Sequence, residues 1–84
     1  MKYFANFNAN NGTRLMHDRL SNNKRKLEKS IRESAEAHRY QGNECSWSVY
    51  ECKTGKCIAA GGMTRYGTRY RHHDLSYFDM CPWP

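Results

Sequence analysis

A hairpin pattern in residues 46–60 limits the possible folds of this chain more than any other signal. Residues 46–52 alternate between two sets of side chains, and a second extended segment starts at Cys57. A period of two is typical of a strand with two different faces. A two-residue turn at Thr54-Gly55 and a four-residue loop over 53–56 both give the same register. The predicted hairpin places Cys52 opposite Cys57, Tyr50 opposite Ala59, Val49 opposite Ala60 and Trp47 opposite Gly62.

A third strand is predicted near the beginning of the chain. In residues 2–7, the side chains of Tyr3, Ala5 and Phe7 fall on one face of an extended segment. The Asn- and Gly-rich residues 8–12 are expected to end this strand in a turn. We expect the strand to pair with one strand of the hairpin, because a hairpin alone is only marginally stable in water.

Residues 13–39 predict a helix because they contain neither Pro nor Gly. Their apolar positions recur at spacings of three, four and seven, which gives one narrow stripe. Thr13 is the expected N-cap, and Gly42 is the expected C-terminal cap. Ser21-Asn22-Asn23 is the weak point, so the segment is either one bent helix or a short helix followed by a longer one from about Lys24. The stripe consists of Met16, Leu20, Leu27, Ile31, Ala35 and His38.

Together these elements predict an α+β fold in the order strand, helix, strand, strand and C-terminal tail. A helix packed across one face of a small antiparallel sheet is the simplest way to bury both apolar stripes. The 84 residues leave room for a single domain, residues 1–84. Gly61-Gly62 is expected to bend or end the last strand, or to let another backbone come close. Residues 64–84 either join the domain or form an irregular basic and aromatic tail.

Neither a membrane-spanning segment nor a secretory leader is predicted. The chain has no stretch that approaches the ~20 apolar residues needed to cross a bilayer. Its first residues include a charge but no apolar segment of a signal peptide behind it. We therefore expect a soluble cytoplasmic protein with no membrane contact, whose cysteines are reduced or metal-bound rather than bridged.

The charge balance indicates an anionic partner. The chain carries 14 Lys and Arg against 8 Asp and Glu, a net charge of +6. The densest cationic cluster, Lys24-Arg25-Lys26, lies at the start of the second half of the predicted helix. The helix macrodipole disfavours cations there, so helix stability does not explain the cluster. The alternative is a solvated helix face held by pairs such as Glu28–Arg32.

A second candidate surface combines cations with aromatic rings. Arg65-Tyr66 is followed closely by Arg69-Tyr70-Arg71 and by His72-His73. Arginine neutralises phosphate and a tyrosine face accepts a stacked base, so this pattern suits a strand of nucleic acid. Two alternatives remain: the tyrosines cover a thin core, or the segment is a protein interface, where Tyr and Arg are also enriched.

The four cysteines and the missing catalytic motifs limit the chemistry. Cys45, Cys52, Cys57 and Cys81 are separated by six, four and 23 residues, and only the middle spacing approaches that of a zinc knuckle. Four cysteines also allow three disulfide pairings, among which the sequence does not choose. We expect reduced thiols with no metal and no cofactor, zinc on these four being the less favoured alternative. The serine-hydrolase, phosphate-loop and zinc-protease motifs are absent, so we expect a protein that is not an enzyme.

In its short length, Asn-rich turns and many aromatic residues, the chain resembles the small basic accessory proteins of tailed bacteriophages. The resemblance implies a non-enzymatic binder that acts in the host cytoplasm and redirects or blocks host machinery. The leading hypothesis is a protein that binds nucleic acid or a nucleic-acid-handling complex. The alternatives are an inhibitor that docks directly on a host enzyme and a disulfide-stapled secreted factor. The candidate contact residues are Lys24, Arg25, Lys26, Lys29, Arg65, Tyr66, Arg69, Tyr70 and Arg71.

Overall fold

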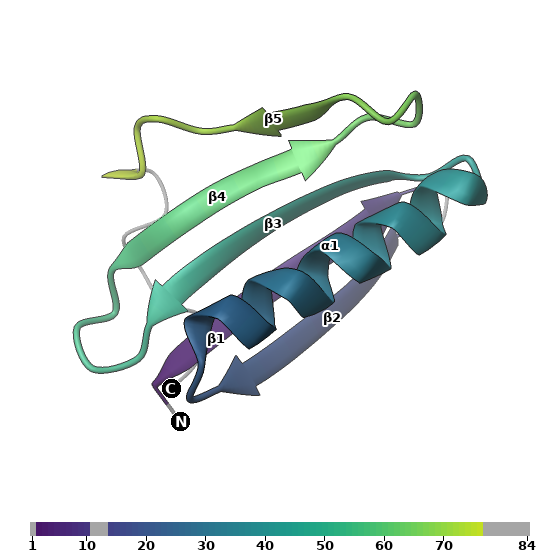
Figure 1. Cartoon of the computed structure of the whole chain (residues 1–84). Helices are drawn as coiled ribbons and strands as arrows, with labels where there is room; N and C mark the ends of the chain where they lie inside the picture. Colours follow the sequence, from purple (N-terminus) through teal and green to yellow (C-terminus); the bar gives the residue numbers. More distant parts are fainter. Residues whose placement is uncertain (1, 11–13, 77–84) are drawn as a thin grey trace.

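The computed structural model describes residues 2–10 and 14–76. Within these ranges the chain forms one α-helix and a five-stranded antiparallel sheet, whose strand order is β2-β1-β3-β4-β5 (Figure 1). The predicted α+β architecture, a helix packed on an antiparallel sheet, is confirmed. The elements are β1 (Tyr3–Asn10), β2 (Arg14–Ser21), α1 (Lys24–Tyr40), β3 (Glu44–Glu51), β4 (Cys57–Met63) and β5 (Arg69–Arg71).

The core lies between α1 and one face of the sheet. Leu27, Ile31 and Ala35 form the buried stripe of α1, at the spacing expected for one side of a helix. The stripe packs against every second residue of the central strands, because successive side chains of a strand point to opposite faces. The sheet residues of this core are Ala5, Phe7, Ala9, Cys45, Val49 and Met63.

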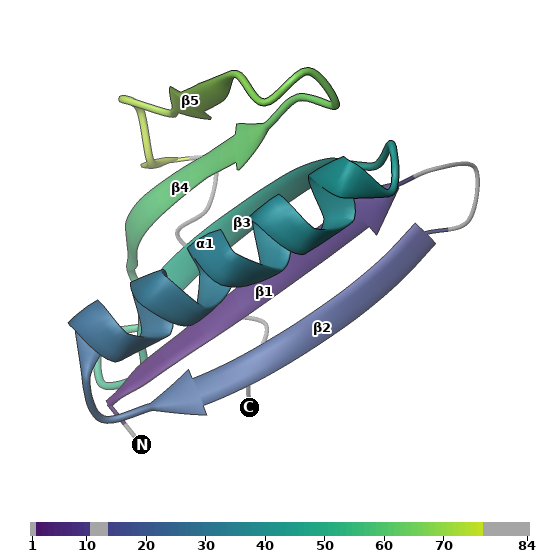
Figure 2. The same cartoon turned by 45° about the vertical axis from the view of Figure 1, so that its right-hand side comes forward.

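The other face of the sheet carries a smaller apolar cluster. Phe4, Tyr50, Cys57 and Ala60 are buried there, and Leu75 packs against them. No helix covers this face within the described ranges (Figure 2). Nor is α1 long and apolar enough to cross a membrane.

The prediction of a helix over residues 13–23 is wrong where the structure describes it. Residues 14–21 form β2, which pairs with β1 along its whole length, from Tyr3 opposite Ser21 to Asn10 opposite Arg14. The apolar spacing in this segment fits a helix locally, but β1 has a second edge whose backbone groups need partners. Pairing along eight residues satisfies that edge, so tertiary context overrides the local pattern.

Both ends of α1 have identifiable caps. The Asn23 side chain accepts a hydrogen bond from the Lys26 N–H at 3.1 Å, so the predicted weak point at residues 21–23 is the true start of the helix. Thr13, the predicted N-cap, lies outside the described residues. At the other end Gly42 has a φ of 80°, and the Gly42 and Asn43 N–H groups bond to the Arg39 and His38 carbonyls. This Schellman arrangement confirms Gly42 as the terminating residue.

The hairpin is confirmed, but its predicted register is wrong by one residue or more. Trp47 lies opposite Gly61 and Val49 opposite Ala59, and an irregularity then places Tyr50 opposite Cys57. The cause is the connecting loop, which the Glu51 N–H closes by bonding to the Lys56 carbonyl. The Cys52 N–H bonds instead to the Lys2 carbonyl, beyond the start of β1.

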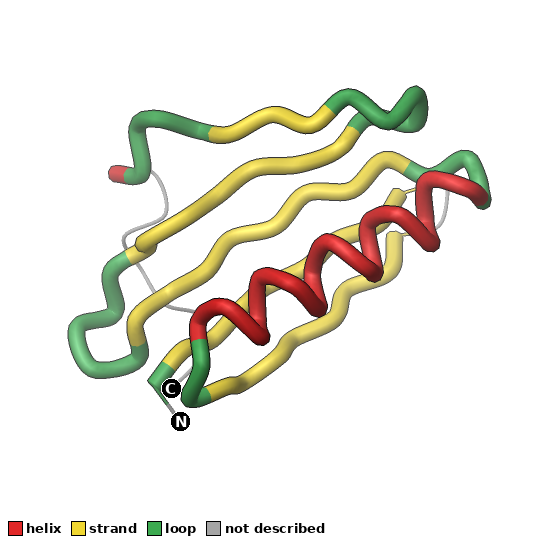
Figure 3. The backbone as a smooth tube through the Cα atoms, in the orientation of Figure 1, coloured by secondary structure: helices red, strands yellow, loops and turns green. Residues whose placement is uncertain are grey.

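The remaining strands extend further than predicted. β1 runs to Asn10 and pairs with β3, which confirms the expected pairing with the hairpin. Part of the predicted tail, Arg69–Arg71, forms β5 on the edge of β4 after a turn over residues 64–68 (Figure 3). Gly61-Gly62 does not end β4, which continues to Met63. A Cβ atom on either glycine would collide with Tyr70, so the predicted close approach is present.

Candidate functional site

A groove lies beside α1, where the helix leaves part of the sheet uncovered. In Figures 1 and 2, α1 runs over β1, β2 and β3, while β4 and β5 extend beyond it. The side of α1 and the exposed sheet face enclose a cavity volume of about 610 Å³. We name it the α1–β5 groove. Residues central to it are Lys24, Arg32, Trp47, Gly61, Arg69 and Arg71.

The floor of the α1–β5 groove is apolar and comes from the central strands. Trp47 and Val49 of β3 lie opposite Gly61 and Ala59 of β4, and all four line the groove. Val49 belongs to the helix-side core, so strand alternation places this whole set on the face that α1 covers in part. Gly61 and Ala59 are small, and the indole of Trp47 is half-buried.

The rim of the groove is cationic on both sides. From α1, Lys24 and Arg32 line it, eight residues apart and about 80° apart around the helix axis. From β5, Arg69 and Arg71 lie opposite Met63 and Gly61, which puts them on the helix side of the sheet. Lys24 pairs with Glu28 at 3.8 Å. Among the described residues Arg32 and Arg71 make no ion pair.

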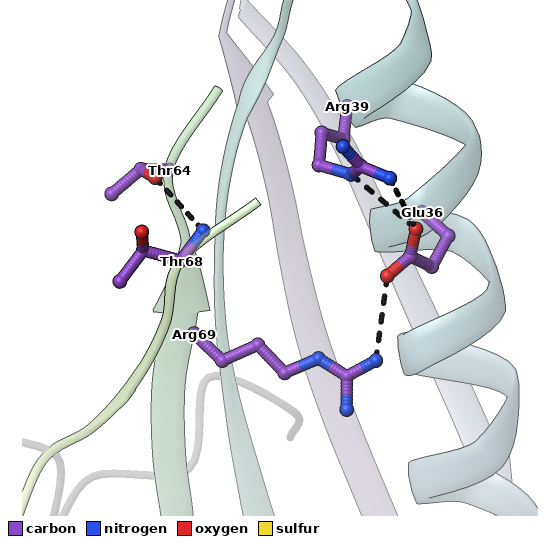
Figure 4. Close-up of polar contacts among 5 residues, drawn as sticks. All are labelled: Glu36, Arg39, Thr64, Thr68 and Arg69. Atoms are coloured by element: carbon purple, nitrogen blue, oxygen red, sulfur yellow. Dashed lines mark hydrogen bonds and ion pairs between the residues drawn. The ribbon is translucent and has the colours of Figure 1, made fainter. Parts of the chain in front are cut away.

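The Glu36 carboxylate links α1 to β5 at one end of the groove. Glu36 of α1 accepts a bond from Arg69 Nη2 at 3.4 Å and is paired with Arg39 Nη2 at 3.2 Å (Figure 4). The hydrogen bonds from Arg39, and then those from Arg69, hold the pKa of Glu36 below its usual value. Arg39 also lies against Gly67, where an added Cβ would meet its Cδ at 3.1 Å. This network connects α1 to β5 and to the turn before it.

The structure brings together some of the predicted contact residues and separates others. Lys24 meets Arg69 and Arg71 in the groove although it lies 45 or more residues from both in the sequence. Lys26 lies about 200° around the helix axis from Lys24, on the opposite flank of α1. The other two helix candidates, Arg25 and Lys29, are exposed and do not line the groove.

The remaining candidates lie near the turn and on the far face of β5. Arg65 pairs with Glu44 at 3.3 Å, and Tyr66 is 84% exposed on the turn. Tyr70 is counted among the residues around the groove, but it lies opposite Gly62 and therefore points to the face away from α1. There its ring covers Gly62 and meets the ring of His72 edge-on at 5.6 Å. Neither predicted tyrosine is therefore a stacking surface of the groove.

Sequence reasoning missed Arg32 and Trp47 as members of the site. Arg32 follows Lys24 and Glu28 at intervals of four, a spacing that marks one helix flank and could have identified it. Trp47 was assigned to the hairpin alone. The small residues expected opposite it were a signal, because they leave room beside its ring.

The cysteines do not assemble into one site in the described part of the chain. Cys45 is buried on the helix side, where burial raises the pKa of its thiol. Cys57 is buried on the other face and donates to the Ala59 carbonyl at 3.3 Å. Because the sheet separates these two thiols, they cannot ligate the same ion. No group of three metal-ligating side chains occurs among the described residues, and Cys81 lies outside them.

Comparisons with protein-family models, with curated proteins and with solved structures find no match to this chain.

Proposed function

We propose that the protein is a non-enzymatic binding protein that holds nucleic acid in the α1–β5 groove. The observation that carries the proposal is the shared position of Lys24, Arg32, Arg69 and Arg71 around an apolar floor. These residues come from two distant segments, and two of the four have no carboxylate partner in the described structure. Cations gathered in this way attract the regularly spaced phosphates of a nucleic-acid backbone.

The composition of the groove favours binding over catalysis. Glu28 is the only carboxylate that lines the described part of the groove, and it is paired with Lys24. A lining rich in guanidinium groups suits phosphate recognition, since each Arg offers several donors in a planar fork. The net charge of +6 adds a long-range attraction to any polyanion.

A salt titration of binding tests this proposal. The double variant Arg32→Gln/Arg71→Gln removes the two groove cations that have no ion pair with any described residue. The matched control, Lys26→Gln/Lys53→Gln, removes the same charge from the opposite helix flank and the β3–β4 loop. Fluorescence anisotropy with a labelled oligonucleotide should give a log–log salt slope that is reduced by about 1.5 in the groove variant, because each lost phosphate contact contributes roughly 0.7–0.9.

Two results would contradict the proposal. The first is the absence of binding by the unmodified protein at low salt. The second is an equal loss of affinity in the groove variant and the control, which would mean that net charge alone attracts the oligonucleotide.

The end of the molecule beside the groove favours a second candidate, docking on another protein. Tyr40 and Tyr66 are 79% and 84% exposed, and the guanidinium of Arg39 lies 4.6 Å from the Tyr40 ring centre. Arg39 also touches Gly67, next to Tyr66, so the two tyrosines belong to the same end of the fold. Exposed tyrosine beside arginine is the composition enriched at protein interfaces.

Capture experiments on nuclease-treated lysate distinguish the two candidates. If docking is the function, a bound protein is retained by Arg32→Gln/Arg71→Gln and lost with Tyr40→Ser/Tyr66→Ser. Loss of every partner after nuclease treatment would contradict docking and favour the groove.

A further inference from the structure

A row of four residues crosses the sheet on the side that faces α1. The strand registers place Phe7 opposite Trp47, Trp47 opposite Gly61 and Gly61 opposite Arg71. Neighbouring strands are spaced about 4.8 Å apart, so Trp47 and Arg71 start from backbones roughly 9.6 Å apart. Gly61 lies between them, lines the groove and has no side chain, and the Tyr70 carbonyl lies close to where its Cβ would be.

Two parallel aromatic rings form one end of the row. Phe7 and Trp47 are parallel to within 7°, with ring centres 6.4 Å apart. Phe7 therefore packs beside the indole on the β1 side. On the β4 side, Trp47 lies opposite Gly61, which has no side chain. The half-buried state of Trp47 and its place in the groove lining agree with this geometry.

The far end of the row provides a second planar group. Arg71 is exposed and makes no ion pair in the described part of the chain, so its guanidinium is available to a ligand. Guanidinium groups stack on flat rings as well as binding phosphate. A planar ring held between two groups needs roughly 7 Å, or two contacts of about 3.5 Å, which the spacing across Gly61 provides.

We propose that the space over Gly61, between Trp47 and Arg71, is a slot for one unpaired base of a single-stranded nucleic acid. This inference rests on the proposed function and specifies that the nucleic acid is single-stranded. Trp47 stacks on one face of the base, and Arg71 covers the other face. Lys24 and Arg32 hold the flanking phosphates from the α1 side of the groove. A base inside a duplex is stacked on its neighbours and cannot enter the slot, so the groove selects single strands.

The test compares ligands of equal charge that differ only in their bases. The protein carries Trp83→Phe, which leaves Trp47 as the sole tryptophan of the chain. The probes are a single strand of about ten nucleotides, within the usual site size, an abasic strand of the same length, a duplex of the same sequence, and poly-glutamate. The natural strand should quench Trp47 fluorescence and bind about 5- to 150-fold more tightly than the abasic strand, which corresponds to one stacked base.

Two variants separate stacking from charge. Trp47→Leu should lose the preference for the natural strand but retain the affinity for the abasic one, with folding checked by circular dichroism. Arg71→Lys, at an exposed position, keeps the charge and removes the planar guanidinium. It should weaken binding of the natural strand while leaving the salt slope unchanged.

Each alternative outcome contradicts a different claim. Equal affinity for natural and abasic strands, or for strand and duplex, overturns the base slot but leaves nucleic-acid binding in place. Failure to bind any nucleic acid overturns the proposed function as well. Saturable quenching by poly-glutamate without binding of nucleic acid assigns the groove to an acidic protein segment instead.

Discussion

Glu36 neutralises part of the cationic charge on the rim of the α1–β5 groove. Its two oxygens are shared between Arg39 on its own helix and Arg69 on β5. Arg69 is therefore partly neutralised, whereas Arg32 and Arg71 have no such partner among the described residues. A single carboxylate thus contributes to structure, by joining α1 to β5, and at the same time opposes binding of an anion.

Replacing this carboxylate should strengthen nucleic-acid binding. Glu36→Gln releases Arg69 and removes one negative charge near the groove, so we expect the dissociation constant to fall by about threefold to tenfold at low salt. The matched control is Glu33→Gln, which makes the same charge change on an exposed position of α1 that has no ion pair to β5. An equal effect of both substitutions would show that Arg69 has no particular role.

The same substitution should lower stability in a pH-dependent manner. The pKa of Glu36 in the folded protein lies below the ordinary value of 4.5, so its ion pairs stabilise the fold above that value. The contribution disappears as the pH falls through the folded pKa, because the protonated carboxyl no longer favours the folded state. The melting temperatures of the unmodified protein and Glu36→Gln should therefore differ at neutral pH and converge as the pH falls through the folded pKa of Glu36. A difference that persists in acid would contradict this account.

At the scale of the elements, α1 depends on Asn23 because its first turn contains no acidic residue. Three cations occupy positions 24–26, where the partial positive charge of the helix N-terminus repels them. The Asn23 side chain compensates in part by accepting the Lys26 N–H. Placing cations there lowers helix stability but puts Lys24 at the groove.

Removal of the Asn23 cap should therefore lower the stability of the fold. We expect Asn23→Ala to reduce the free energy of unfolding by about 1 kcal/mol, within the range of roughly 0.5–2 kcal/mol typical of N-caps. Asn23→Ser keeps an oxygen acceptor at the same position and should stay close to the unmodified protein. Urea denaturation followed by circular dichroism measures both. Equal losses in the two variants would show that the side-chain bond is not the cause.

The errors in the predicted elements have a common physical origin. Sequence patterns predicted the presence of α1 and of the hairpin because their signals are local. Apolar periodicity marks one face of an element, and Gly42 marks the end of the helix. The apolar spacing of residues 14–21 predicts a helix, but this segment forms a strand because it pairs with the edge of β1. Local spacing does not encode that pairing. β5 was missed for a similar reason, since three exposed residues carry no apolar alternation.

At the scale of the whole molecule, the groove exists because the helix is not centred on the sheet. Adding β2 at one edge gives α1 three strands to cover, and β4 and β5 then extend past it on the other side (Figure 1). The sequence predicted Lys24, Arg69 and Arg71 as cations for an anion, but not the floor between them. That floor comes from Trp47 and Gly61, and their juxtaposition depends on a hairpin register that was predicted one residue away.

This topology also predicts which part of the molecule responds to a ligand. β1 and β3 are paired on both edges and buried against α1, so their amides should exchange with solvent only when the whole domain unfolds. Among the strands that the structure describes, β5 pairs with β4 alone, and its three residues are exposed, so its amides should open first. Hydrogen exchange measured with and without a single-stranded oligonucleotide should show protection concentrated in β5 and the first half of α1, with β1 and β3 unchanged. An oligonucleotide held by Arg69, Arg71 and Arg32 must slow the opening of the segments that carry these residues. Protection confined to the turn around Tyr66 would therefore contradict binding in the groove and place the ligand at the exposed tyrosines.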